Sequence, residues 1–392
     1  MSTRPVIVAT TRTPVGTAFK GSLAGTPAET MAAHVVRSAL ERSGLGADRV
    51  DDIVLAESHY GGGDLARHAA VATGLTSVPG LAVNRHCAGG LSATAVAATT
   101  VAAGAASVVI AGGVQSTSLT PVMKQRVPGT ADEFVEPWMP FTHPDSAEAP
   151  AMDMSITVGW NTARAYAISR EAMDEWALRS HQRAIAAIDD GTFVDEIDPI
   201  EAVRADGQSA VFAVDEHPRR STTAEKLASL APVHPEIDGF SITAGNASGL
   251  NDAAAALVVA DPDTARSTGV TALAQIRAVA STATSPRDTG SAAIAVIRRL
   301  LDRSGLTVAD VALWEINEAF ASVPIAACRE FGISEDVVNI HGSGCSIGHP
   351  IAASGGRMIA TLVGDLRRRG GGIGVAAMCA GGGQAGGVVV EV

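Results

Sequence analysis

The sequence predicts an α/β fold made of two copies of one unit, with a long segment inserted into the first copy. Short apolar runs alternate with Ala-rich segments of helical spacing, which is typical of strands and helices in succession. The stretch 39–57 is echoed at 300–318, so the second half of the chain repeats the first. Between 116 and 245 the alternation breaks, and this segment holds 10 of the 18 prolines.

Length and composition indicate a large globular protein and exclude several classes of partner. The 392 residues are 46% hydrophobic, which is enough to bury a large core. Aromatic residues make up only 4% of the chain and glycines number 41, so we expect helices and sheet to pack closely through small side chains. The net charge of −12 and the shortness of the longest basic run, at 367–369, argue against nucleic acid and anionic membranes as partners.

The cysteines and the N-terminal residues predict a cytoplasmic protein. Four cysteines are too few for a disulfide scaffold, and they lack the C-x-x-C spacing of metal sites. Residues 1–9 contain neither an apolar signal segment nor an Arg-rich transit segment, and no run of 18 apolar residues occurs in the chain. We therefore expect no targeting signal, no membrane span and no metal.

The elements of the first copy follow one another in a regular order. We expect a strand at 5–10, a helix at 28–43, a strand at 50–56, a helix at 65–74, an apolar run at 81–83, a helix ending near 103 and a buried strand at 106–111. Gly44 directly follows the first helix, as a C-terminal glycine cap does. Because strands and helices alternate, we expect a mostly parallel sheet covered on both faces.

The inserted segment has a different character. It contains three of the four tryptophans and a charged helix at 169–190, so it is expected to carry loops over the core. Surface decoration and substrate binding are both open as its role. Regular structure returns with the Gly-Asn-Ala-Ser-Gly-Leu-Asn-Asp stretch at 245–252 and the apolar run that follows it.

The repeat sets the domain boundaries that we expect. Asn84-Arg85-His86, with the helix that follows, is echoed by Asn339-Ile340-His341 with its own helix. We predict a first half at 1–116, completed by 246–262, an inserted loop domain at 117–245, and a second half at 263–392. Turns at equivalent strand ends of the two halves would face one crevice, where open α/β sheets bind ligands.

Cys87 is the first candidate for chemistry. It lies between the apolar run at 81–83 and a helix, at the turn where unpaired N–H groups and the positive end of the helix dipole favour a thiolate. The small residues Ala88, Gly89 and Gly90 leave room for a large group to reach the sulfur. A lone cysteine that packs like a small apolar residue is the alternative.

Three turns of the second half carry further reactive groups. Asn317 follows a strand, His349 lies in a glycine-rich turn that leads into a helix, and Cys379 follows the strand at 373–378. Taken singly, each has a structural alternative: a capping asparagine, a structural histidine and a buried core thiol.

Together these residues resemble the four active-site motifs of the thiolase family. Cys87 lies in N-x-x-C-x-G-G, Asn317 in N-E-A-F-A, His349 in G-H-P-I-A-A-S-G and Cys379 in C-A-G-G-G, and the stretch 245–252 is similar to the thiolase segment that contacts coenzyme A. The resemblance runs nearly end to end. It implies a five-layer αβαβα core with an inserted loop domain, and an acyltransferase that makes or cleaves the carbon–carbon bond of 3-ketoacyl-CoA.

The resemblance also implies a role for each residue. Cys87 would carry the acyl group as a thioester, His349 would take its proton, and Cys379 would exchange the α-proton of acetyl-CoA. Asn317 would order a water that, with His349, holds the enolate oxygen, and the backbone N–H groups of Cys87 and Gly381 would hold the oxyanion.

The resemblance also implies which residues contact coenzyme A. Ser248 would contact the pantetheine arm of coenzyme A and Arg219 its nucleotide end, with a solvated surface arginine as the alternative for Arg219. Coenzyme A thioesters are expected as substrates, no cofactor is expected to be tightly bound, and the family relationship implies a homodimer or homotetramer.

The sequence departs from the family pattern in two places. Cys345 is an additional thiol four residues before His349, and we expect mild oxidation to link it to Cys87 or Cys379 if it does not simply fill the core. The segment 154–161, which lines the acyl pocket in the family, differs from the usual motif and is expected to hold an additional residue. Acyl chain length is therefore left open.

Three other classes of protein share some of these features. A decarboxylating condensing enzyme of the ketoacyl-synthase type would have a second histidine in place of N-E-A-F-A. A non-catalytic binding homologue would be expected to lack one of the four residues. A papain-like cysteine hydrolase would pair a cysteine with a histidine but would need neither Cys379 nor the duplication.

Overall fold

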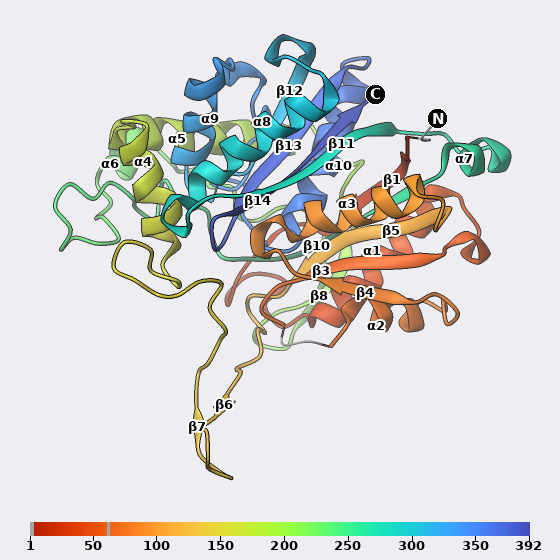
Figure 1. Cartoon of the computed structure of the whole chain (residues 1–392), viewed down its shortest axis with the longest axis horizontal. Helices are drawn as coiled ribbons and strands as arrows, with labels where there is room; N and C mark the ends of the chain where they lie inside the picture. The colour runs from red at the N-terminus through yellow and green to blue at the C-terminus, as the bar shows by residue number, and fades with distance from the viewer. Residues whose placement is uncertain (1–3, 61–62) are drawn as a thin grey trace.

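The computed structural model describes residues 4–60 and 63–392, so Met1–Thr3, part of the stretch in which we expect no targeting signal, lie outside the described residues (Figure 1). Within those ranges the main sheet has ten strands. In order across the sheet they are β12 (Val311–Ile316), β13 (Ile373–Ala380), β14 (Gln384–Glu391), β11 (Ala274–Ala283), β1 (Val6–Arg12), β10 (Asn251–Ala260), β5 (Val108–Gln115), β3 (Asp52–Glu57) and β4 (Gly80–Val83), with β2 (Gly16–Thr17) paired to β10.

Four of the helices, α1, α2, α3 and α5, agree to within a few residues with the helices expected from the sequence at 28–43, at 65–74, ending near 103 and at 169–190. The helices of the described residues follow in chain order. They are α1 (Ala28–Ser43), α2 (Leu65–Ala72), α3 (Gly89–Ala102), α4 (Asn161–Ala165), α5 (Arg170–Asp189), α6 (Ala224–Ala228), α7 (Pro262–Thr268), α8 (Ala292–Ser304), α9 (Ser322–Phe331) and α10 (Ser354–Arg368). The repeated Ser-Gly-Leu triplet ends two of them in the same way. Gly44 after α1 and Gly305 after α8 both adopt left-handed backbone conformations, with φ of 68° and 65°.

The predicted duplication is confirmed by the order of the strands. The first half contains β3, β5, β10 and β1 as neighbours, and the second half contains β12, β13, β14 and β11 in the same succession. The two halves join where β1 pairs with β11, through Val6 opposite Gln275 and Ile7 opposite Ala274.

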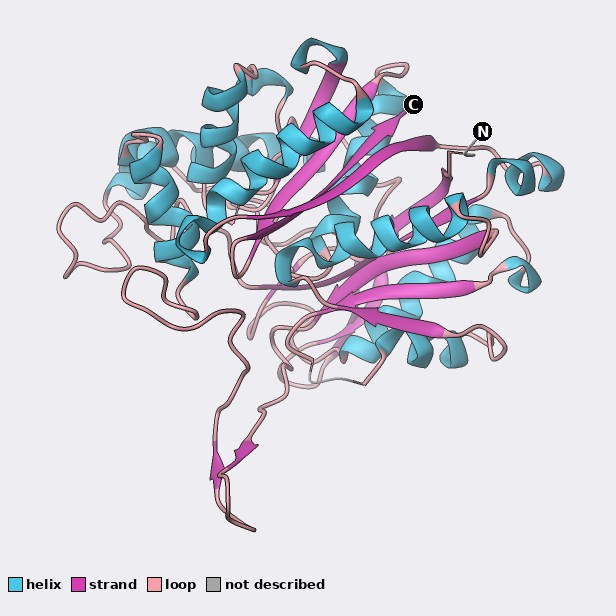
Figure 2. Cartoon of the chain, in the orientation of Figure 1, coloured by secondary structure: helices cyan, strands magenta, loops and turns pink. Residues whose placement is uncertain are grey.

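Helices complete the five layers that the family resemblance implies (Figure 2). α1 packs against β1, β5 and β10, and α8 packs against β11, β13 and β14. Between the two halves lie α3 and α10, which contact each other and strands of both halves. The order is therefore α1, first half-sheet, α3 with α10, second half-sheet, α8.

The expectation of a mostly parallel sheet is wrong. Only β3–β4, β3–β5 and β12–β13 run parallel among the pairs in the described main sheet, and the other pairs are antiparallel. The reason lies in the last strands of each half. β14 follows β13 through a tight turn, which forces an antiparallel pair, and β10 enters beside β5 only after the insertion.

The end of strand β5 was also predicted wrongly, because the glycines indicated the end of the strand. The strand expected at 106–111, before Gly112 and Gly113, runs through both glycines and spans Val108–Gln115. A Cβ at Gly112 would lie 2.0 Å from the Ala255 carbonyl oxygen, and one at Gly113 would lie 2.0 Å from the Ala352 carbonyl oxygen. These glycines mark close approaches of neighbouring backbones within a strand and not the end of the strand.

The chain between β5 and β10 forms the segment predicted as an inserted loop domain. It contains α4–α6, the small pair β8 (Ile200–Val203) and β9 (Ser209–Phe212), and a hairpin of β6 (Gln125–Arg126) and β7 (Phe134–Val135) that projects from the body (Figure 1). No helix of the described residues is long and apolar enough to cross a membrane.

A buried ion cluster fastens the insertion to the first strand. The guanidinium of Arg12, at the end of β1, donates to both carboxylate oxygens of Asp215 at 2.8 Å and to Glu196 at 2.7 Å. All three side chains are buried. Burial raises the pKa of Glu196, and the charge of Arg12 opposes that shift. The arginine thus offsets the cost of burying the negative charge.

We predict that Arg12→Met destabilises the protein by roughly 3–5 kcal/mol, because two carboxylates are left in the interior without a cation. The midpoint of urea unfolding, followed by circular dichroism, measures the change. Arg220→Met is the matched control, since Arg220 forms a two-pronged pair with Asp189 at the surface and its loss should leave the midpoint nearly unchanged. Equal midpoints for the two variants would contradict this role of Arg12.

Candidate active site

Cys87 occupies the turn that the sequence predicts. The turn His86–Ala88 follows β4 and leads directly into α3. His86 has a φ of 44°, a left-handed conformation that non-glycine residues seldom adopt. The side-chain oxygen of Asn84 accepts from the His86 N–H at 2.8 Å and so holds this turn in place.

The environment of the Cys87 thiol differs from the expectation. Burial raises its pKa to about 11, although the backbone N–H groups of Cys87 and Gly381 oppose the shift. The expectation that the helix terminus favours a thiolate is therefore wrong for the ground state, because loss of solvent outweighs the amide donors. The thiol is neutral near pH 7, and the backbone N–H groups of Cys87 and Gly381 are near enough to act on its pKa.

His349 is buried and neutral. Its backbone N–H donates to Asn251 Oδ1 at 2.9 Å, and its Nδ1 lies 2.6 Å from Ser354 Oγ. Burial, assisted by the positive charge of Arg357, lowers the pKa of His349 to about 4. In the described residues Nε2 has no hydrogen-bond partner, so it is the ring nitrogen free to accept or donate a proton.

Asn317 presents a second set of unpaired polar atoms. The residue follows β12 and its backbone N–H donates to the Ala377 carbonyl of β13 at 3.1 Å. Its side chain is 1% exposed, yet neither Oδ1 nor Nδ2 has a partner within residues 4–60 and 63–392. Buried amides are normally hydrogen-bonded, so both atoms are free to bond to a water or a ligand.

Cys379 lies close to Cys87. It is the penultimate residue of β13, and not beyond the strand as the sequence suggested. Burial raises the pKa of Cys379 far above the usual value, and the neighbouring Cys87 adds to the shift. Gly381, two residues further on, supplies the N–H that faces Cys87.

The glycines at the starts of α3 and α10 bring the two halves of the site together. A Cβ at Gly90 would lie 2.9 Å from the Ala352 carbonyl oxygen, and one at Gly355 would lie 2.3 Å from the Leu91 nitrogen. The helices can therefore approach closely, so the turns that precede them, with Cys87 and His349, converge. A cavity of about 140 Å³ lies at this point and is lined by Cys87, Gly381 and Ile351, among others.

The residues that hold these turns in place were mostly missed from the sequence. Asn251 accepts from His349 and donates to the Gly16 carbonyl at 3.0 Å, so the first half positions a histidine of the second. The Asn251 side chain occupies the space where a Cβ on Gly348 would lie, which accounts for glycine there. A signal existed for Asn251, because it belongs to the 245–252 motif, but its role was not foreseen.

Glu318 is a second residue whose role was missed, although it lies in N-E-A-F-A. Its carboxylate is buried and accepts four hydrogen bonds from Trp176 Nε1, Ser180 Oγ, Asn339 Nδ2 and the Cys345 backbone N–H, at 3.0, 2.5, 2.9 and 3.2 Å. It therefore joins the Asn317 turn to the glycine-rich turn before His349 and to α5 of the insertion.

Ser248 and Arg219 lie on neighbouring segments. Ser248 is half-buried, and its N–H donates to the Ala319 carbonyl at 2.9 Å. Arg219 is exposed, and its backbone N–H donates to His181 Nδ1 at 3.1 Å. The two segments touch where His217 packs under Gly249, since a Cβ there would lie 2.3 Å from the His217 ring.

The two departures from the family pattern are both structured. Cys345 is buried, and its thiol lies 3.3 Å from the Glu318 carbonyl oxygen, which fits the core-filling alternative. Its oxidative link to Cys87 or Cys379 stays a prediction. The segment Ser155–Trp160 forms a π-helical turn, whose wider backbone holds more residues per turn than an α-helix, in keeping with the additional residue expected there.

Within the described residues, no group of three or more His, Cys, Asp or Glu side chains could hold a metal ion. The arrangement instead offers a thiol facing two amide donors, a neutral imidazole with one free nitrogen, an unpaired amide and a second thiol. Chemically, it can form a covalent adduct on sulfur, move protons and stabilise negative charge on oxygen.

Comparisons with known proteins agree with the motifs. The family model described as thiolase, N-terminal domain, matches residues 5–263, and that described as thiolase, C-terminal domain, matches residues 270–392. The chain is 40% identical to an acetyl-CoA acetyltransferase of Pseudomonas aeruginosa, over 97% of each chain, and 38% identical to a beta-ketoadipyl-CoA thiolase of Pseudomonas knackmussii, over 100% of each. It is similar to the crystal structure of the Bacillus anthracis acetyl-CoA acetyltransferase, with a TM-score of 0.89 and 34% identity over 100% of this chain and 99% of that chain.

We predict that iodoacetamide alkylates Cys87 first, because Cys87 is only half-buried and lines a cavity, whereas the other three cysteines are buried. Since burial raises the pKa of Cys87 to about 11, the thiolate fraction is small near neutrality, and the alkylation rate should climb through pH 9 without a plateau. Peptide mapping by mass spectrometry over a pH series measures this, with Cys87→Ser as the control. A plateau near pH 7 would mean that the thiol is ionised in the resting protein.

Proposed function

The chain belongs to the thiolase family, and on that premise we propose that it makes and cleaves the carbon–carbon bond of 3-ketoacyl-CoA through an acyl thioester on Cys87. The reaction converts acetyl-CoA and an acyl-CoA into a 3-ketoacyl-CoA and free CoA, or runs in reverse. The observation that carries the proposal is that Cys87 and Gly381 line one cavity, where the backbone N–H groups of both residues oppose the rise in the pKa of the thiol. Donors in this position stabilise the oxyanion that forms when a thiol attacks a carbonyl.

In the cleavage direction, the Cys87 sulfur attacks the 3-keto carbon while His349 Nε2 takes the thiol proton. The transfer takes place during the attack, since burial keeps the thiol protonated and the imidazole neutral beforehand. The oxyanion is held by the N–H groups of Cys87 and Gly381. When it collapses, the bond between C2 and C3 breaks, which leaves an acyl thioester on Cys87 and the enolate of acetyl-CoA.

Cys379 then gives its proton to the enolate carbon and becomes a thiolate. During this step the enolate oxygen is held by the protonated His349 and by a water that Asn317 orders, a role supported by the unpaired amide of Asn317. After acetyl-CoA leaves, the thiol of free CoA gives its proton to Cys379 and attacks the acyl thioester. The departing Cys87 sulfur recovers its proton from His349, and the cycle closes.

Coenzyme A is proposed to bind along the segments that carry Ser248 and Arg219. Ser248 contacts the pantetheine arm, which is supported by its half-buried position beside the Asn317 turn. Arg219 is exposed and next to that segment, where it can meet the phosphates of the nucleotide end. A homodimer or homotetramer in the cytoplasm is proposed as the working form, on the family resemblance alone.

The chemistry favours a thiolase over the rivals that share its fold. A decarboxylating condensing enzyme needs a second histidine where this chain has Asn317, and the thiol of Cys379 has no task in it. A non-catalytic homologue would be expected to lack one of the four residues Cys87, Asn317, His349 and Cys379, and all four are present in this chain.

We predict that Cys87→Ser abolishes the covalent acyl adduct while the fold is retained, because a hydroxyl of similar volume is a far weaker nucleophile at this site. The protein is incubated with acyl-CoA and weighed intact by mass spectrometry, and cleavage of 3-ketoacyl-CoA by added CoA is followed in parallel. An adduct of unchanged yield in the variant would place the acyl group on another residue.

We predict that Cys379→Ala still forms the acyl thioester but exchanges the methyl protons of acetyl-CoA with deuterated solvent about 10²- to 10⁴-fold more slowly, because it lacks the base that forms the enolate. Proton NMR of acetyl-CoA in D₂O measures the exchange. Cys328→Ala, which removes a buried thiol from α9, is the control and should exchange at the wild-type rate. Equal rates in the two variants would exclude Cys379 as the base.

A further inference from the structure

A second, larger cavity continues outward from the one at Cys87. The inner cavity measures about 140 Å³ and the outer about 760 Å³. They share five lining residues, which are His59, Met139, Pro140, Phe141 and Met152. The inner space alone is smaller than a typical small-molecule pocket, whereas the two together fall within the usual range.

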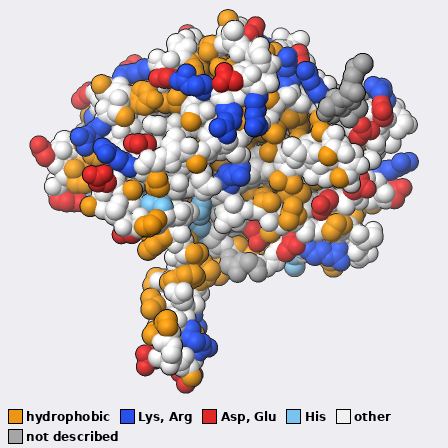
Figure 3. Space-filling view, viewed as in Figure 1, with side chains coloured by type: hydrophobic (Ala, Val, Ile, Leu, Met, Phe, Trp, Pro, Cys, Tyr) orange, Lys and Arg blue, Asp and Glu red, His pale blue; other side chains and the backbone are white. Residues whose placement is uncertain are grey.

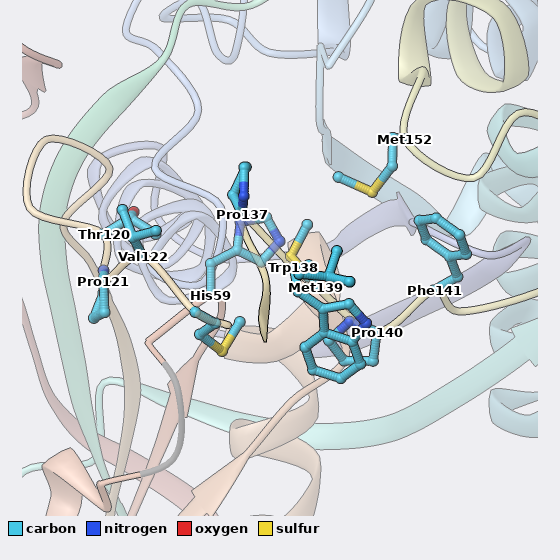
Figure 4. A pocket seen from close by; sticks show the side chains of 12 residues that line it. His59, Thr120, Pro121, Val122, Pro137, Trp138, Met139, Pro140, Phe141 and Met152 are labelled. Atoms are coloured by element: carbon cyan, nitrogen blue, oxygen red, sulfur yellow. The ribbon is translucent and has the colours of Figure 1, made fainter. Parts of the chain in front are cut away.

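The walls of the outer cavity are apolar. Figure 4 shows Val122, Thr120 and Pro121 on one side of it, Phe141 and Met152 on the other, and Trp138 and Met139 between them. The side chains of Val122, Phe141 and Met152 are all exposed, and hydrophobic side chains gather along the projecting segment and its base (Figure 3). A ligand that covers this surface is stabilised by the apolar area that it removes from water.

Neither cavity is built to receive a charge. No lysine or arginine lines either of them in the part of the chain that the structure describes. The two titratable side chains that face the inner cavity beside Cys87 are His59 and His86, whose rings lie 6.0 Å apart. Burial lowers the pKa of both, so neither imidazole serves as a cation near neutrality. A carboxylate placed here would lose its water without a partner.

We propose that the acyl group that Cys87 carries is large and apolar, an alkyl chain of eight or more carbons or a ring system, and that its distal part lies in the outer cavity. The inference rests on the proposed thioester at Cys87 and names the class of acyl group. Acetyl groups are too small to reach the outer cavity, and acyl groups that end in a carboxylate are disfavoured.

Two other occupants of the outer cavity are less well supported. The arm of coenzyme A is expected along Ser248 and Arg219, and no residue between 215 and 252 is among those that line either cavity. A second copy of the chain could cover the apolar surface of the projecting hairpin. The five lining residues that the two cavities share favour the acyl group as the occupant. An acyl chain bound to Cys87 would pass between these residues from the inner cavity into the outer one.

The first experiment compares the cleavage of three substrates by CoA. They are acetoacetyl-CoA, 3-ketoadipyl-CoA and 3-ketododecanoyl-CoA. We expect kcat/KM for 3-ketododecanoyl-CoA to exceed that for each of the others by tenfold or more, because added methylenes bind in apolar walls. A kcat/KM for acetoacetyl-CoA or 3-ketoadipyl-CoA that equals or exceeds it overturns the inference. Failure of the proposed function itself looks different, since no substrate is then cleaved and no adduct forms on Cys87.

The second experiment places a charge in the outer cavity. Val122→Asp should lower the ratio of kcat/KM for 3-ketododecanoyl-CoA to that for acetoacetyl-CoA by about tenfold or more. Val211→Asp is the matched control, because Val211 on β9 is 75% exposed, as against 77% for Val122, and lines neither cavity. Its ratio should stay at the wild-type value.

Light scattering on both variants tests the rival occupant. If Val122→Asp changes the molar mass of the assembly and leaves the substrate ratio unchanged, the surface receives a second copy of the chain and the inference falls. A lowered ratio with an unchanged mass supports it.

Discussion

The site depends on one buried carboxylate, that of Glu318. Its four donors come from α5 in the insertion, from the turn at Asn339 and from the backbone at Cys345. These segments are far apart in the chain, and each lies next to a turn that carries chemistry. Because a buried carboxylate is strongly destabilising unless it is fully hydrogen-bonded, the fold must bring all four donors to it at once. The positions of Asn317 and His349 therefore depend on the hydrogen bonds that the Glu318 carboxylate accepts.

Burial also sets the protonation states of Cys87 and His349. It raises the pKa of Cys87 and lowers that of His349, so the resting pair is a neutral thiol and a neutral imidazole. In the proposed mechanism each group changes charge only when a substrate supplies a compensating oxyanion, which the amides of Cys87 and Gly381 would receive. A thiol kept neutral in this way is also less open to stray electrophiles than a standing thiolate.

Motif and periodicity predicted a great deal. The repeat and the helix capped by Gly44 were predicted from local pattern, since turn chemistry and helical spacing are properties of short segments. The four candidate reactive residues were assigned through motifs that match the thiolase family, and their roles stay predictions. Strand direction was predicted wrongly, because β10 finds its neighbours only after the long insertion. The pKa of Cys87 was misjudged for a similar reason. A helix terminus is visible in the sequence, whereas loss of solvent depends on what the rest of the chain places around the sulfur.

The pairing of β1 with β10 affects the order in which the protein can be built. Thr13, just after β1, bonds to Ala254, which lies 241 positions away in the chain. At a synthesis rate of about 5–20 residues per second, the first strand leaves the ribosome tens of seconds before its partner exists. Until then its apolar edge has no native neighbour, so the nascent chain is open to wrong pairings and aggregation. Nascent-chain protection by a chaperone would matter most in that interval.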